Sequence, residues 1–350
     1  MDFGVTAAAI EDVGYLSFAE NLGYDFAWAP DSQLLMSNPF PLMALAAQQT
    51  RRIRLGTGLA IAGLRLAPVL ANAIATINRL APGRVFLGVG TGNTAMRTMG
   101  QRPMAIKPFG EYVRVVRSLL AGEEIEYTHG GVTHLVRFQN RQLGHGDSPI
   151  PIHLGGLGPR AQTLAGELGD GLVTSLPRGG ALADIRARLE RGAASAGRSL
   201  DGFETVTLLN LLLLQPGESL SDDHVVAQCG SAIMANVHYL VDLHRETGAE
   251  PPAYVLPIWE EYLEFHATRD AERAHQQLHQ SHYVYLDRDE ARFITPEIIR
   301  NFCLAGQPAE IVEQLRAMEA QGVTGVNFIF PNAERYRMTE DFARKVIATY

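Results

Sequence analysis

The sequence has few cysteines, no long apolar run and no excess of basic residues. Only Cys229 and Cys303 occur among its 350 residues, which excludes a disulfide framework or a thiolate zinc site. No run of about 18 apolar residues is present, and the first residues lack the basic segment and apolar core of a secretory signal. The formal net charge is −8. We therefore expect a cytoplasmic protein that binds neither nucleic acid nor membrane.

The usual nucleotide-binding motifs are also missing. The glycines that follow one apolar segment are spaced Gly88-x-Gly90-x-Gly92, which does not match the G-x-G-x-x-G of dinucleotide-binding folds. No GK[ST] sequence is present either, which argues against a phosphate-binding P-loop. We therefore do not predict a dinucleotide-binding fold.

The stretch Arg54–Gly92 shows what the chain has instead. Two short apolar segments, Ile53–Thr57 and Val85–Gly88, flank a helical pattern that begins near Pro68. The segments show no polar alternation, which is typical of parallel strands buried on both faces. Each segment runs into glycines at its carboxyl end. We predict a β-α-β unit with open backbone at one rim, where missing Cβ atoms let a flat ligand approach.

The same order of apolar strand, glycine or proline turn and helix recurs along the chain. A length of 350 residues suits one barrel with insertions, and no linker or internal repeat divides it. We predict an α/β fold, a (β/α)8 TIM barrel, in a single domain over residues 1–350. Its strands are expected at Phe3–Thr6, Phe26–Ala29, Ile53–Thr57, Val85–Gly88, Pro149–Gly155, Gly171–Ser175, Thr205–Leu213 and Gly325–Phe330.

Residues 221–294 depart from this pattern. Val225–Thr247 reads as a long helix, and the aromatic segment PPAYVLPIWEEYLEFH follows it. We predict a helical insertion between strand seven and the last barrel unit that covers the barrel mouth or forms a dimer surface through exposed aromatic residues. His275, His279 and His282 have helical spacing, but no H-E-x-x-H motif accompanies them, and the sequence predicts no metal site.

The rim motifs resemble those of a known family. Arg54–Gly92, together with GGLGPRAQTLAGELGDGLVTS from Gly155 onward, is similar to the luciferase-like flavin and deazaflavin oxidoreductases, which are (β/α)8 barrels that bind FMN or coenzyme F420. The resemblance is greatest to the F420-dependent branch of methylenetetrahydromethanopterin reductases and glucose-6-phosphate dehydrogenases. It covers nearly the whole chain and is strongest over Phe26–Gly100 and Pro149–Thr174. It is more specific for the fold than for the substrate.

The resemblance implies a cofactor site at the barrel rim. Gly58 and Leu59 align with a bulge that holds a non-prolyl cis peptide against the cofactor ring. The turn Gly155–Leu157 would contact the ring, and Arg178 with Gly179 would hold the phosphate. The implied cofactor-binding residues are Asp31, Gly58, Leu59, Asn93, Gly155, Gly156, Leu157, Thr174, Arg178 and Gly179.

Two positions depart from the sugar-phosphate dehydrogenases of this family. Those enzymes carry a histidine where this chain has Ser32 and a glutamate acid where it has Asn93. Asparagine donates a hydrogen bond but cannot deliver a proton at neutral pH. Glucose 6-phosphate is therefore not the expected substrate. The candidate catalytic residues are Asp31, Ser32 and Asn93, with His282 as a further acid if the insertion covers the mouth.

The expected activity is hydride transfer between F420 and a small organic substrate. The alternative is an FMN-dependent monooxygenase that takes reduced flavin from a separate reductase and uses O2, and a second alternative is a flavin-binding protein without turnover. The anionic tail of F420 would need cations. Those available are Arg97, Arg102, Arg160 and Arg178. A homodimer is also expected.

Overall fold

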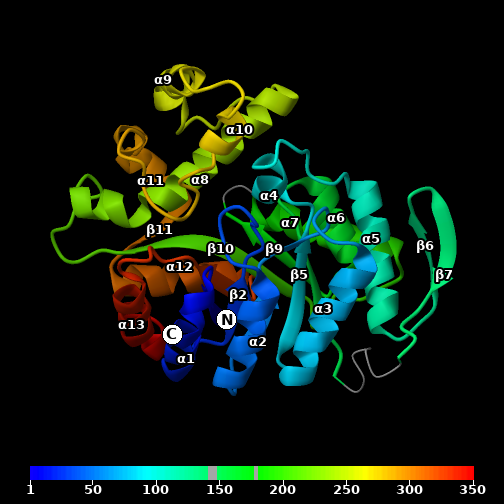
Figure 1. The fold of residues 1–350 in the computed structure, drawn as a ribbon. Helices are drawn as coiled ribbons and strands as arrows, with labels where there is room; N and C mark the ends of the chain where they lie inside the picture. The colour runs from blue at the N-terminus through cyan, green and yellow to red at the C-terminus, as the bar shows by residue number, and fades with distance from the viewer. Residues whose placement is uncertain (141–147, 177–179) are drawn as a thin grey trace. The chain divides into compact units, whose positions relative to one another are not determined.

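A computed structural model describes residues 1–140, 148–176 and 180–350. The main sheet has the strand order β11-β10-β12-β1-β2-β3-β5-β8-β9, and β9 also pairs with β10. That last pairing closes β1, β2, β3, β5, β8, β9, β10 and β12 into an eight-stranded parallel barrel, which confirms the predicted fold (Figure 1). No helix within the described ranges is long and apolar enough to cross a membrane.

The barrel strands follow the predicted ones closely. They are β1 (Asp2–Thr6), β2 (Phe26–Ala29), β3 (Arg54–Thr57), β5 (Val85–Gly90), β8 (Ile152–Gly155), β9 (Gly171–Ser175), β10 (Glu204–Leu213) and β12 (Gly325–Phe328). Two short strands, β4 (Ala60–Ile61) and β11 (Cys303–Gly306), are not predicted by the sequence. β4 has only two residues, and β11, with the sequence CLAG, holds no β-branched or aromatic residue, so no strand pattern identifies either of them.

Helices follow the strands and bury one apolar face. They are α1 (Val13–Asn21), α2 (Pro39–Gln49), α3 (Ala67–Leu80), α5 (Ile106–Leu120), α6 (Pro159–Leu168), α7 (Leu182–Ser195), α12 (Pro308–Ala320) and α13 (Arg335–Lys345). α3 is representative: Pro68 lies in its first turn, and its buried residues include Leu70, Ile74 and Ile77. One further element, α4 (Asn93–Arg97), is a short helix directly after the glycines that end β5.

A small hairpin stands outside the barrel. Its strands are β6 (Ile125–His129) and β7 (Val132–Val136), which pair antiparallel beyond α5 (Figure 1). Gly130 and Gly131 form its turn with φ angles of 59° and 79°, a left-handed conformation that favours glycine. Most hairpin side chains are exposed, so the hairpin adds little to the barrel core.

An ion network lies where the barrel strands begin. Arg54 at the start of β3 binds Asp2 of β1 at 2.7 Å and Glu204 of β10 at 2.8 Å. Its guanidinium carbon lies 5.9 Å from the ring centroids of both Phe26 and Phe86. Charged and aromatic groups therefore fill the amino end of the barrel, which in this fold serves stability, and leave the carboxyl end for a site.

Glu20 on α1 secures the chain that enters β3. Its carboxylate is 8% exposed and accepts hydrogen bonds from the backbone N–H groups of Arg51, Arg52 and Ile53 at 2.6–3.1 Å. Burial raises the pKa of this carboxyl, but the three backbone donors outweigh burial and hold the pKa below its ordinary value of 4.5. Glu20 is therefore ionised and stabilising at neutral pH.

Glu20→Gln is expected to lower the free energy of unfolding by about 2 kcal/mol at neutral pH, because one amide oxygen cannot satisfy three donors. A folded pKa below the unfolded pKa means that the contribution is present above the unfolded pKa and lost as pH falls through the folded pKa. Urea unfolding of wild type and variant should therefore show a gap at pH 7 that narrows in acid. The exposed Glu11→Gln is the control. Equal stabilities of wild type and Glu20→Gln at pH 7 would contradict this role.

The chain divides into two compact units. The first comprises Met1–Ala95, Arg102–Thr207 and Gln321–Asn327, and the second comprises Met96–Gln101, Leu208–Ala320 and Phe328–Tyr350. A single domain over the whole chain stays a prediction of the sequence.

The second unit contains the predicted helical insertion. The insertion holds α8 (Asp223–Thr247), α9 (Leu256–Ala267) and α10 (Ala274–Gln277), and α11 (Pro296–Phe302) follows directly after it. They enclose a core of their own that includes Trp259 at 3% exposure and Tyr262 at 0%. The interpretation of these rings as an exposed dimer surface is therefore wrong, whereas a homodimer formed elsewhere stays a prediction.

Candidate functional site

The chain forms a bulge between β3 and β4 at the carboxyl end of the barrel. The peptide bond between Gly58 and Leu59 is cis, as the resemblance implied. The Gly58 N–H donates to the Ala29 carbonyl at 3.0 Å, and the chain rejoins the sheet where Ala60 lies opposite Val89. The bulge is thus held between β2 and β5.

The Leu59 side chain lies against three glycines of the rim. A Cβ added to Gly90 would lie 2.9 Å from Leu59 Cδ1, and a Cβ added to Gly155 would overlap the same atom. Gly88 faces Leu59 in the same way, with Cδ2 at 2.9 Å. The space that the sequence assigns to a ligand is therefore occupied by Leu59. Because Leu59 and Gly58 remain half-buried, a flat ligand at the rim would meet the bulge itself.

Trp28 on β2 is a candidate site residue that the sequence did not single out. A Cβ at Gly58 would lie 2.5 Å from Trp28 Cβ, so only glycine fits beside the indole. Trp28 Nε1 is buried and has no hydrogen-bond partner among the described residues. A buried donor left unpaired costs about 1–3 kcal/mol, which a ligand acceptor would recover. The sequence could have indicated Trp28 as a candidate, because it lies near the carboxyl end of β2 and, two residues after Phe26, on the same face of the strand.

The turn after β2 connects two other rim loops. The Asp31 carboxylate is 3% exposed and pairs with both Nη atoms of Arg65, and Oδ2 also accepts from the Ile61 N–H at 3.2 Å. Two residues on, Gln33 Nε2 donates to the Ala95 carbonyl in α4 at 2.9 Å. The turn Pro30–Gln33 therefore connects the loops that follow β3 and β5. A role for Asp31 as a proton donor would require this ion pair to open.

The other predicted catalytic residues lie near the same strand ends. Ser32 is half-buried, and its carbonyl accepts from the N–H groups of Leu35 and Met36 at 2.9 and 2.8 Å. Asn93 is half-buried and is the first residue of α4. Since both are neutral and Asp31 is ion-paired, the rim suits binding and orientation better than strong acid–base chemistry.

The glycine-rich turn after β8 has a structural support. Gly156 is buried, and a Cβ there would lie 2.9 Å from Leu172 Cδ1, so this glycine lets α6 pack on β9. Gln162, 0% exposed, donates to the Leu157 carbonyl at 3.2 Å and accepts from Arg188 Nη1 at 2.8 Å. Gln162 and Arg188, which the sequence did not single out, therefore position the backbone of the turn.

Thr174 lies on the outer face of its strand. Gly171 makes room for the buried His153 ring, and strand alternation places Val173 and Ser175 on that inner face. Thr174 Oγ1 is buried without a hydrogen-bond partner among the described residues. The hydroxyl therefore does not share the inner face on which a ring contact is expected.

The predicted cations have different environments. Arg178 and Gly179 lie outside the described residues. Arg97 belongs to the second unit, where it pairs with Asp242 at 3.2 Å and Glu246 at 2.6 Å. It is therefore not an open cation for a ligand tail, while Arg102 is exposed.

Arg160 lies on a basic groove at the start of α6. The groove has a volume of about 360 Å³, and its lining includes Arg188 and Arg191 of α7 with Glu167 as its one carboxylate. Arg160 and Arg191 are exposed and form no ion pair with any described residue. This groove, beside the turn that Gln162 supports, can hold an anionic group. Arg188 and Arg191 join Arg160 only through the packing of α7 on α6, which the sequence does not show.

Comparison with known proteins agrees with the predicted fold and resemblance. The family model described as luciferase-like monooxygenase matches residues 6–325. The chain is 28% identical to the 5,10-methylenetetrahydromethanopterin reductase of Archaeoglobus fulgidus over 89% of this chain and 87% of the relative. It is 30% identical to the F420-dependent glucose-6-phosphate dehydrogenase of Beutenbergia cavernae, over 96% and 91%.

The solved structure of the coenzyme F420-dependent tetrahydromethanopterin reductase of Methanopyrus kandleri has the same fold. It matches with a TM-score of 0.70 and 21% identity, over 100% of this chain and 99% of the other. The family match covers most of the chain and agrees with the cis bulge and the glycine-rich rim. The chain therefore belongs to the luciferase-like monooxygenase family.

Proposed function

We propose that the protein is an F420-dependent oxidoreductase that transfers a hydride between the deazaflavin and a small organic substrate. The observation that carries the proposal is the bulge at Gly58 and Leu59 on the barrel rim, where the Leu59 side chain packs against the rim glycines. Similarity over nearly the whole chain to an F420-dependent dehydrogenase supports the choice of cofactor. The bound cofactor would supply a ring carbon that gives or accepts hydride.

The residues present fit a flat cofactor with an anionic tail. Gly58 and Leu59 would back the ring, and the orphaned indole N–H of Trp28 offers a buried donor. The Asp31–Arg65 pair fixes the loop that follows the bulge. Asn93 and the turn Gly155–Leu157 are the proposed contacts for the polar edge of the ring. The groove of Arg160, Arg188 and Arg191 would take the tail.

The substrate class is narrowed by what the rim lacks. Ser32 and Asn93 replace the histidine and glutamate expected of a sugar-phosphate dehydrogenase, so we propose a small organic molecule other than glucose 6-phosphate. Reduction of a carbonyl by hydride also consumes a proton, and since Ser32 and Asn93 are neutral and Asp31 is ion-paired, solvent would supply that proton. A cytoplasmic location and a homodimer stay predictions from the sequence.

An FMN-dependent monooxygenase is the second candidate, and the description of the matching family favours it. It would use O2 and reduced flavin from a separate reductase. The two candidates share the bulge and rim glycines, since one fold supports both chemistries. They differ in the tail, because F420 carries a longer anionic chain that would use the basic groove.

Replacing both exposed arginines of the groove, Arg160→Ala with Arg191→Ala, is expected to weaken F420 binding about tenfold, because exposed ion pairs contribute about 0.2–1 kcal/mol each. The loss should shrink at high salt, which screens the wild-type contacts as well. Fluorescence titration at two ionic strengths measures both effects. Arg186→Ala is the control, because Arg186 lies on α7 like Arg191 but pairs with Glu190 outside the groove. Unchanged F420 affinity in the double variant would remove the groove from the tail site.

Activity assays separate the two candidates. The purified protein is mixed anaerobically with oxidised or reduced F420 and a panel of alcohols, aldehydes, ketones and enones, and cofactor absorbance is followed. Substrate-dependent change in F420 absorbance supports the proposal. Oxygen consumption and product formation only with reduced FMN would replace it with the monooxygenase, and tight cofactor binding without turnover in either assay would favour the flavin-binding alternative.

A further inference from the structure

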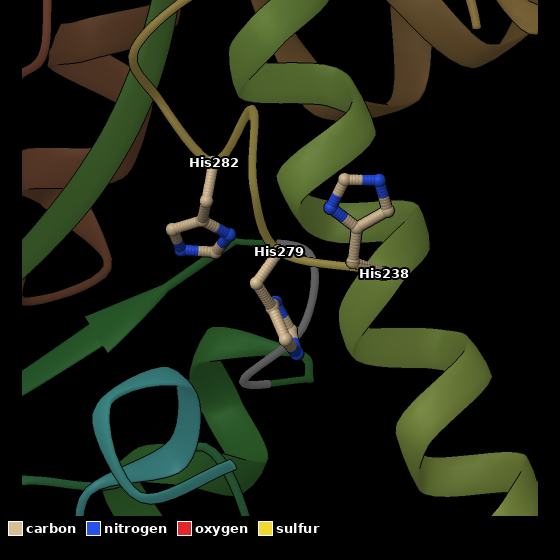
Figure 2. A group of neighbouring side chains, drawn as sticks. All are labelled: His238, His279 and His282. Carbon is tan, nitrogen blue, oxygen red and sulfur yellow. The ribbon is translucent and has the colours of Figure 1, made fainter. Parts of the chain in front are cut away.

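Three histidines of the second unit face one another in the helical insertion. His238 lies on α8, while His279 and His282 lie in the turns that follow α10 (Figure 2). One ring nitrogen of each lies within 4.8 Å of the other two. The three side chains are 0%, 1% and 8% exposed. Helical spacing in the sequence places His275 beside His279 and His282. In the structure the third histidine of the cluster is His238 instead.

Two of the histidines are oriented by carboxylates. His238 Nε2 lies 3.0 Å from Glu290 Oε1, and His279 Nε2 lies 2.9 Å from Asp242 Oδ2. A carboxylate only accepts, so each ring presents an Nε2–H to it, and the neutral form of such a ring keeps its lone pair on Nδ1. Nδ1 of His238 and Nδ1 of His279 are both buried without a hydrogen-bond partner among the described residues. This is the arrangement of a metal-binding histidine with its outer carboxylate.

The two carboxylates are themselves held in place. Glu290, 1% exposed, also accepts from the Tyr262 hydroxyl at 2.8 Å and the Ser281 hydroxyl at 3.3 Å. Asp242 also binds Arg97 Nε at 3.2 Å. Glu290 is buried and the side chain of Asp242 is 14% exposed, and a core of apolar residues alone would not need two such carboxylates, because each costs free energy to remove from water.

We propose that His238, His279 and His282 bind one Zn²⁺ ion, with water as the fourth ligand. Imidazole nitrogens suit Zn²⁺, whereas Mg²⁺ and Ca²⁺ prefer oxygen ligands. Two nitrogens bound to tetrahedral Zn²⁺ at about 2.0–2.1 Å lie about 3.3 Å apart, so the rings need to close by about 1.5 Å at most. The ion would fasten the turns after α10 to α8. This site is independent of the proposed cofactor.

The test uses full-length protein free of any affinity tag, stripped with chelator and kept without F420 or FMN. Calorimetric titration is expected to show one Zn²⁺ per chain with micromolar or tighter Kd, and no binding of Mg²⁺. Co²⁺-loaded protein should show the visible bands of a four-coordinate ion, and X-ray absorption of the Zn²⁺ form should show three imidazole ligands. Absence of stoichiometric Zn²⁺ binding at tens of micromolar would overturn the proposal.

Variants locate the ion. His279→Ala and His282→Ala should weaken Zn²⁺ binding by more than the 10- to 100-fold that loss of an outer partner costs. His275→Ala, on α10 and outside the cluster, should bind as wild type does. Circular dichroism tests whether each variant is folded. If a variant is unfolded, the Co²⁺ and X-ray absorption spectra of the wild type determine whether three imidazoles bind the ion. Undiminished binding by folded His279→Ala and His282→Ala would place the ion elsewhere and overturn the assignment. Because no F420 is present, the outcome does not depend on the proposed function.

Discussion

Gly88→Ala is expected to abolish cofactor binding, whereas Gly90→Ala, two residues along the same strand, is expected to retain it. A Cβ at Gly88 would overlap the backbone carbonyl oxygen of Thr57, which cannot rotate away. The Thr57 hydroxyl also donates to the Gly88 carbonyl at 2.6 Å, so the two strands are fixed at this point. The chain must therefore shift just before the Gly58–Leu59 bulge. At Gly90 the nearest atom is the flexible end of Leu59, at 2.9 Å.

The magnitude of the Gly88→Ala effect follows from overpacking in a closed core. The free energy of unfolding should fall by about 3 kcal/mol, at the upper end of the cost of an added methyl group. The Kd for F420 should rise about 100-fold or more, which corresponds to about 2.7 kcal/mol of lost binding. Thermal unfolding and fluorescence titration measure the two quantities. If Gly88→Ala binds F420 as wild type does, the bulge is not the ring platform, whereas equal impairment of Gly90→Ala would show that the end of Leu59 cannot move aside.

Asp31→Ala is the second substitution with a large expected effect. It should lower the free energy of unfolding by about 3–5 kcal/mol, because it leaves the Arg65 guanidinium without its buried partner. The side chains of Asp31 and Arg65 are only 2% and 18% exposed, so little solvent is available to replace the lost pair. The Ile61 N–H of β4 also loses its acceptor. We therefore expect weaker cofactor binding together with the loss of stability.

A double-mutant cycle separates the ion pair from other effects of the cavity. Asp31→Ala with Arg65→Ala should be more stable than the sum of the two single losses predicts, because neither partner is then left alone. Urea unfolding of the wild type, both single variants and the double variant gives the coupling. A stability loss below about 1 kcal/mol for Asp31→Ala, the typical value for exposed pairs, would show that the pair does not hold the rim.

Much of the barrel could be predicted because its signals are local. Strands such as Val85–Gly90 are apolar without alternation, and Pro68 and Ala81 bracket a helix of clear period. The rim position of Asp31 follows from the same reasoning, since it comes directly after a strand. The short elements α4 and β4 were beyond this reasoning, because five and two residues are too few to show a period.

What the sequence could not show depends on contacts between distant segments. Leu59 occupies the space beside Gly155 only because the bulge turns it across two neighbouring strands. That Trp28 Nε1 is buried without a partner among the described residues depends on the segments that pack around the indole, which include Gly58. His238 joins His279 through the packing of the insertion, and helical spacing in the sequence favoured His275 instead. Patterns along the chain predict helices and strands, whereas these sites form only where several helices, strands and loops come into contact.

The most direct measurement is titration of the purified apo-protein with F420 and, separately, with FMN, followed by the fluorescence of each ligand. We expect micromolar or tighter binding of F420, weaker binding of FMN, and loss of F420 binding in Gly88→Ala but not in Gly90→Ala. Selective binding of FMN would contradict the deazaflavin assignment and favour the monooxygenase. Binding of neither ligand would contradict the assignment of a cofactor site to the Gly58–Leu59 bulge.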